Sequence, residues 1–177
     1  MATTSEAPVT AGAATHTTIR SSLGDLTLVA RDGSVTGLYF PHHWHMPDRS
    51  AFGEYRDAGS GDVQRQLDEY LAGERREFDV PLEAAGSPFQ ERVWQLISRV
   101  PYGKTVSYGE LARELGGGIT AQEVGNAVGR NPVSIIIPCH RVVGASGGLT
   151  GYAGGLRRKR ILLDLEQDVA GRSARLF

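Results

Sequence analysis

Cysteine is almost absent from this chain of 177 residues, which contains a single one, Cys139. One cysteine excludes an intrachain disulfide and a zinc site built from several thiolates. It is therefore a small buried hydrophobic residue, a redox sensor or a nucleophile, and burial is the common state of a free cysteine. The role of Cys139 must therefore be inferred from the residues around it.

Long apolar segments are missing as well. No run approaches the roughly 20 apolar residues that are needed to cross a bilayer. The amino terminus, MATTSEAPVTAGAATHTT, has no apolar core, no basic start and an early Glu6, so it predicts neither a secretory signal nor a transit peptide. We therefore expect a cytoplasmic protein with no membrane partner and a disordered tail over residues 1–15.

The net charge of -1 conceals an uneven distribution of charged residues. Residues 1–84 contain 7 Lys and Arg against 13 Asp and Glu, whereas residues 85–177 contain 12 against 7. A basic carboxyl half is typical of a surface that binds a polyanion, although a solvated face of the protein can look the same.

The apolar pattern predicts a mixed α/β (α+β) chain with domains over residues 16–84 and 85–168 and a carboxyl-terminal tail over 169–177. In the first domain, a helix is predicted over residues 62–73 because its apolar residues recur at helical spacing. Alternating apolar and polar residues between turn signals predict strands, three of them in an antiparallel meander. These strands are expected over residues 17–22, 25–30, 34–40 and 77–83.

The second domain is predicted to have a core of its own around a helix that starts at Ser87. Capping boxes mark three helix starts, Ser87 with Gln90, Ser107 with Glu110 and Thr120 with Glu123. The last two helices, separated by a glycine turn, form a helix-turn-helix candidate that binds nucleic acid or serves as a plain packing unit. The run SIIIP is expected to be a buried strand, and residues 156–167 a helix with an exposed basic first turn.

The stretch NPVSIIIPCHRVVG places His140 directly after Cys139. A thiol attacks as the thiolate, so a reactive cysteine needs a base or a positive environment. Adjacent side chains on a straight strand point to opposite faces, so the pair can cooperate only if the chain turns there or a water bridges them. The glycine-rich segment that follows permits such a turn.

Three segments, NPVSIIIPCHRVVG, LTGYAGG and FQERVWQLISRVPYGKTVSYGELA, together resemble the O6-alkylguanine-DNA alkyltransferases, also called methylated-DNA-protein-cysteine methyltransferases. The resemblance covers residues 88–166 closely and the amino half in outline. It implies an amino-terminal antiparallel-sheet domain of ribonuclease-H-like type and a mainly α domain with a helix-turn-helix of winged-helix type. It also implies an irreversible, single-turnover transfer of an alkyl group from O6-alkylguanine, and from O4-alkylthymine, in double-stranded DNA to Cys139, with no cofactor.

Residue roles follow from the same resemblance. Cys139 is implied as the acceptor and His140 as a base acting through a water, while Glu166 orients the imidazole. Tyr108 is implied to help rotate the nucleotide and to protonate the departing guanine. The other implied site residues, which support the site or contact the base or the DNA, are Ser107, Gln122, Asn126, Val128, Gly129, Asn131, Arg141, Val142, Tyr152 and Ala153.

The chain departs from the family pattern at two of these positions. Gln122 stands where members typically have the arginine that fills the gap left by the flipped base, and Ala153 stands where a serine often bonds O6. Extrusion of the base and tolerance for larger alkyl groups are therefore expected to differ in this chain.

Two other functions stay open at this level. A sensor of the same fold would bind alkylated DNA without repairing it, although such relatives replace the cysteine that this chain keeps. A cysteine hydrolase could use Cys139, His140 and Glu166 over many turnovers.

The histidines of PHHWHM lack metal-site spacing, so a solvated loop and no metal are expected there. On DNA we expect a monomer, acting alone or cooperatively.

Overall fold

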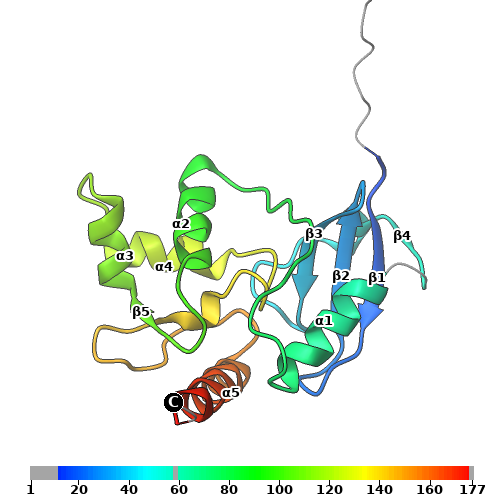
Figure 1. Ribbon diagram of the computed structural model, residues 1–177. Coiled ribbons are helices and arrows are strands. Elements are labelled where there is room, and N and C mark those ends of the chain that lie inside the picture. The colour runs from blue at the N-terminus through cyan, green and yellow to red at the C-terminus, as the bar shows by residue number, and fades with distance from the viewer. Residues whose placement is uncertain (1–11, 58–59, 176–177) are drawn as a thin grey trace, which may run out of the picture.

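The computed structural model describes residues 12–57 and 60–175, so most of the tail predicted over 1–15 lies outside the described residues. A sheet with one helix forms the first half of the chain, and a group of helices forms the second (Figure 1). No helix within the described ranges is long and apolar enough to cross a membrane.

The first half is built on a four-stranded sheet in the order β3-β2-β1-β4. The predicted antiparallel meander is confirmed and consists of β1 (Thr15–Ile19), β2 (Leu26–Arg31) and β3 (Ser34–Tyr39). The two-residue strand β4 (Glu54–Tyr55) pairs with β1 in parallel, and no pattern predicted it. The predicted helix is α1 (Gly61–Leu71), which crosses in front of the sheet in Figure 1.

The prediction of a strand over residues 77–83 is wrong. Only an isolated bridge forms there, between Leu82 and Val35. Val35 N donates to the Pro81 carbonyl at 2.8 Å, and the Val35 carbonyl accepts from Glu83 N at 2.9 Å. Pro81 has no N–H of its own to donate, so it cannot extend this bridge into a ladder. The segment therefore touches the sheet at one point and then crosses to the second half.

The helices of the second half begin where the capping boxes predicted, at Ser87, Ser107 and Thr120. They are α2 (Pro88–Ser98), α3 (Tyr108–Leu115) and α4 (Ala121–Gly129). The last helix, α5 (Leu156–Ala174), runs past its expected end at residue 167 and into the expected tail, because Val169 continues its buried face. A short parallel pair, β5 (Val106–Ser107) and β6 (Val142–Val143), lies between these helices in the sequence.

The expectation of a separate second core is wrong, because buried residues of both halves form one continuous cluster. The backbone of Leu38 on β3 exchanges two hydrogen bonds with the second half, accepting from Ser134 N at 3.1 Å and donating to Pro132 O at 2.8 Å. Trp94 of α2 donates from Nε1 to the carbonyl of Ala127 on α4, at 2.8 Å. The helices and the sheet therefore share one interior, and the division at residues 84–85 stays a prediction.

Candidate active site

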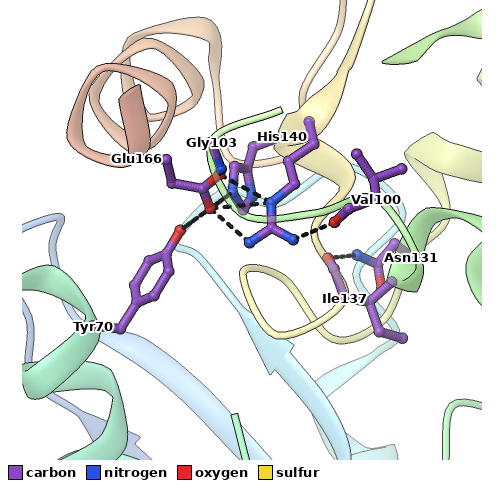
Figure 2. A network of polar contacts seen from close by, with 8 residues as sticks. Tyr70, Val100, Gly103, Asn131, Ile137, His140 and Glu166 are labelled. Carbon is purple, nitrogen blue, oxygen red and sulfur yellow. Dashed lines mark hydrogen bonds and ion pairs between the residues drawn. The ribbon is translucent and has the colours of Figure 1, made fainter. Parts of the chain in front are cut away.

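The segment before Cys139 turns sharply instead of forming the strand that its isoleucines predicted. Ile135 has a left-handed φ of 70°, which a β-branched residue rarely adopts. The Asn131 side chain holds this turn, since Nδ2 donates to Ile137 O at 2.9 Å (Figure 2). Its Oδ1 accepts from Val133 N at 2.9 Å. Cys139 then begins a 3-10 helix, η2 (Cys139–Arg141), so the chain does turn at the cysteine and histidine.

Cys139 is buried, with 4% of its surface exposed. Burial raises the pKa of its thiol, while a hydrogen bond from Asn131 and the charge of Lys159 oppose that rise. The Asn131 amide lies 3.1 Å from Sγ. The thiol thus keeps its proton at rest and needs a base before it can attack.

The imidazole of His140 is fixed by one of its two nitrogens. Nε2 lies 2.8 Å from Oε1 of Glu166, and because a carboxylate can only accept, we assign the proton to Nε2. The other nitrogen, Nδ1, is buried and has no hydrogen-bond partner among the residues that the structure describes. Burial lowers the pKa of His140 despite the opposing effect of Glu166, so the ring is neutral and can accept a proton at Nδ1.

Glu166 is the centre of a buried polar network (Figure 2). Arg141 donates to it from Nη2 at 2.8 Å and from Nε at 3.0 Å, and the Gly103 N–H donates at 3.0 Å. The hydroxyl of Tyr70, on α1, donates to Oε1 at 2.6 Å. Burial alone would raise the pKa of Glu166, but the hydrogen bonds from His140 and Arg141 and the charge of Arg141 outweigh it and lower the pKa to about 2. The carboxylate is therefore ionised at any physiological pH.

A cavity of about 140 Å³ opens beside Cys139. It is small compared with the roughly 300–1,000 Å³ of pockets for drug-sized ligands, so it can enclose only a small chemical group. Its walls come from the loop after β3, from the α3–α4 pair and from the loop before α5. The lining residues are Trp44, His45, Tyr108, Gly125, Asn126, Val128, Gly129, Cys139, Gly151, Tyr152 and Ala153.

Tyr108 lines this cavity, and its hydroxyl can donate a proton. Its hydroxyl donates to Thr150 O at 2.7 Å, and burial raises its pKa, so the phenol stays protonated at neutral pH. Tyr152 is buried, and its hydroxyl has no hydrogen-bond partner within the described ranges. Because an unpaired buried hydroxyl is costly, this atom favours a polar ligand or a water nearby.

The remaining residues implied by the family resemblance lie at the helix-turn-helix or behind the thiol. Ser107 caps α3, and Gln122 is exposed on α4, where Asn126 and Arg130 continue an exposed row at four-residue intervals. Neither Ser107 nor Gln122 lines the cavity. Val142 is buried in β6, with its carbonyl already bonded to Lys159.

Lys159 was missed by the sequence analysis, which placed it on an exposed basic turn of α5. It is instead fully buried, at 0% exposure. Its ammonium donates to the carbonyls of Val142 at 2.5 Å, Gly151 at 3.1 Å and Thr150 at 3.2 Å. Burial lowers its pKa to about 8, so the group is still largely charged at pH 7 and fixes the loop that forms one wall of the cavity. Tyr70 and Trp44 were also missed, since both come from the first half of the chain.

Replacing Lys159 with methionine is expected to reduce the free energy of unfolding by about 3 kcal/mol, because three carbonyls lose a charged donor inside the fold. Urea denaturation monitored by circular dichroism measures the change. Arg160→Met on the next, exposed residue of α5 is the matched control and should shift stability little. Equal losses in the two variants would contradict a clamping role for Lys159.

Two protein-family models match this chain, one in each half. The family model described as 6-O-methylguanine DNA methyltransferase, ribonuclease-like domain, matches residues 15–84. The model described as 6-O-methylguanine DNA methyltransferase, DNA binding domain, matches residues 88–168. The matched ranges contain the sheet and the helix-turn-helix, respectively.

Individual relatives agree with these matches. The chain is 47% identical over 162 residues to the methylated-DNA--protein-cysteine methyltransferase of Mycolicibacterium paratuberculosis, covering 92% of this chain and 98% of the relative. It is 36% identical over 158 residues to the constitutive enzyme of that name from Bacillus subtilis, covering 86% and 94%. A solved structure, Mycobacterium tuberculosis OGT in complex with DNA, is similar with a TM-score of 0.82 at 44% identity, covering 88% of this chain and 94% of that one.

Proposed function

The chain belongs to the family of methylated-DNA–protein-cysteine methyltransferases, and we propose that Cys139 is the residue to which it transfers an alkyl group from DNA. The activity of the family is the repair of alkylated DNA, and double-stranded DNA is the partner of the α3–α4 pair. The substrate that we propose is O6-alkylguanine, with O4-alkylthymine as a second one. A sensor that binds without repair is disfavoured, because relatives that match nearly the whole chain are named methyltransferases.

The substrate base must leave the duplex before it can reach Cys139. An enzyme that reacts with a base in a duplex extrudes it, at a cost of a few kcal/mol in stacking and pairing. The cavity lies between α3, α4 and the 151–153 loop, so a base extruded beside α4 has a short path to the thiol. Gln122 and Asn126 are exposed on α4 and are our candidates for contacts with the duplex.

The chemistry is a displacement at the alkyl carbon. The thiol proton moves through a water to Nδ1 of His140, and the thiolate attacks the carbon on O6. The new S–C bond forms as the C–O6 bond breaks, and the departing guanine takes a proton from the Tyr108 hydroxyl, which the solvent or the imidazolium restores. Because the product thioether is not readily hydrolysed, each molecule reacts once, and the step needs no cofactor.

One observation carries this proposal: the two nitrogens of His140 have different environments. Nε2 is held by an ionised carboxylate, whereas Nδ1 is buried and unpaired among the described residues. A neutral imidazole oriented in this way is a base that can accept only at Nδ1. The Glu166 anion then stabilises the imidazolium that forms.

Incubation with a duplex that contains one O6-methylguanine tests the proposal. The Cys139 peptide is expected to gain the mass of one CH₂ unit, in an amount equal to the guanine restored in the DNA. A matched duplex with ordinary guanine should leave the peptide unchanged. An unmodified peptide with intact lesion DNA would contradict the proposal, and repeated turnover on a small ester or amide would favour a hydrolase.

We also propose a monomer in the cytoplasm. A reactive thiol stays reduced in the cytosol and is prone to oxidation outside it. Sedimentation of the protein with short duplexes of increasing length separates single binding from cooperative binding.

A further inference from the structure

Trp44 is an exposed aromatic residue at the rim of the cavity. It is 61% exposed, more than the other exposed large hydrophobic residues among the described part of the chain, and it still lines the cavity that contains Cys139. Trp44 comes from the loop after β3, in the first half of the chain. Other lining residues belong to the second half, such as Tyr108 on α3 and Asn126 on α4. The first half of the chain thus contributes to the substrate pocket.

The loop holds Trp44 in place. His43 on one side is buried and packs edge-on against the ring of Tyr39, with ring centroids 5.3 Å apart. The backbone N–H of Trp44 donates to Ala153 O at 3.2 Å, which joins the loop to the opposite wall of the cavity. His42 and His45 have φ values of 57° and 60°, a conformation that non-glycine residues adopt where the surroundings enforce it. An indole that is exposed but anchored in this way is placed for contact with a ligand.

The geometry of guanine directs its O6 substituent away from the DNA strand. The strand is attached at N9, and O6 lies on the other ring of the purine. A base that enters past α4 therefore presents O6 to the thiol with the strand behind it. The cavity of about 140 Å³ has little room beyond one ring system, so a substituent larger than methyl must contact the lining residues, among which Trp44 is an exposed aromatic side chain.

We propose that Trp44 determines specificity for large, planar O6 substituents by stacking on them at the rim of the cavity. This inference rests on the proposed function, because it needs O6-alkylguanine in the pocket. Trp44 touches the substituent and takes no part in proton transfer, so it affects the choice of substrate and leaves the reaction itself intact.

Rates of transfer from O6-methylguanine and O6-benzylguanine duplexes test this role. Trp44→Ala is expected to slow the benzyl reaction about tenfold and to change the methyl reaction about twofold or less, because only the aromatic substituent loses a stacking partner. Trp44→Phe should retain most of the benzyl rate. Tyr55→Ala is the matched control, since Tyr55 is a 52% exposed aromatic residue of the same half that does not line the cavity.

The rates distinguish failure of the proposed alkyl transfer from failure of the proposed role of Trp44. Failure of the unmodified protein to accept methyl would overturn the proposed function. Normal methyl transfer with equal benzyl rates in Trp44→Ala and the unmodified protein would overturn only the role of Trp44. A faster benzyl reaction in Trp44→Ala would also overturn it, because Trp44 would then be a steric barrier.

Fluorescence provides a second measurement that does not depend on the rate. Trp94, the only other tryptophan, is buried and serves as an internal reference. In a Cys139→Ser protein, which cannot react, binding of an O6-benzylguanine duplex should quench the fluorescence emission of Trp44. The same quenching should be absent when Trp44→Phe is added to that protein. Quenching that persists in the Trp44→Phe protein would contradict stacking on Trp44.

Discussion

A protein with Glu166→Gln is expected to lose about 3–5 kcal/mol of its free energy of unfolding at pH 7, because the change leaves the buried Arg141 guanidinium without its anion. Alkyl transfer from O6-methylguanine should slow by at least about a hundredfold. A neutral amide can still accept one hydrogen bond from His140, but it does not stabilise the imidazolium. Urea denaturation gives the first quantity, and single-turnover kinetics gives the second.

The dependence on pH identifies the carboxylate as the source of this stability. The pKa of Glu166 is about 2 in the fold, below its ordinary value of 4.5, so the unfolded chain binds the proton more readily. Its contribution is complete above about pH 4.5 and is lost as the pH falls towards 2. The difference in stability between the unmodified protein and Glu166→Gln should therefore shrink by about 3 kcal/mol across that window.

Asp164→Asn is the matched control for Glu166→Gln. Asp164 lies on the same helix, is exposed, and makes no ion pair among the described residues. Its removal should change neither the transfer rate nor the stability at pH 7 by a measurable amount. If Glu166→Gln behaved like this control, the polar network would not be what orients His140.

Cys139→Ser is expected to abolish transfer while binding of the lesion duplex continues. Serine keeps an acceptor for the Asn131 amide and fits the same space, but its hydroxyl is far less acidic than a thiol and does not become a nucleophile with this base. The dissociation constant for the lesion duplex should stay within about fivefold of that of the unmodified protein, since about one neutral hydrogen bond is altered.

Gel-shift titration measures the binding of this variant, and analysis of the bases after incubation measures the lesion. The duplex with ordinary guanine controls for non-specific binding. Loss of the lesion in the Cys139→Ser protein would assign the reaction to a different nucleophile. Loss of both binding and transfer would mean that Cys139 holds the fold of the pocket, and it would weaken its assignment as the acceptor alone.

Local signals in the sequence predicted the helix starts correctly. A capping box needs only a residue and its neighbour three positions later, and the boxes at Ser87, Ser107 and Thr120 all form. The meander was predictable for the same reason, because its strands alternate and its turns contain glycine. Cys139, His140 and Glu166 were predicted from the family resemblance, and the structure brings the histidine and the glutamate into contact.

Contacts between distant segments could not be predicted in this way. The isoleucine run has the composition of a strand, but the Asn131 side chain binds its backbone and forces Ile135 into a left-handed conformation. Lys159 belongs to a basic stretch that is typical of an exposed helix face, and its burial depends on three carbonyls from β6 and from the loop that follows it. Nothing near Tyr70 in the sequence indicates that it reaches a carboxylate 96 residues later.

The bond from Tyr70 to Glu166 has a consequence for the order in which the protein becomes active during synthesis. Cys139 leaves the ribosome before Glu166, which lies on α5, the last described helix. Until α5 docks against α1, His140 has no carboxylate to orient it, and the thiol of the nascent chain is unactivated. A stalled or truncated chain that lacks α5 is therefore expected to react with alkylated bases far more slowly than the complete fold.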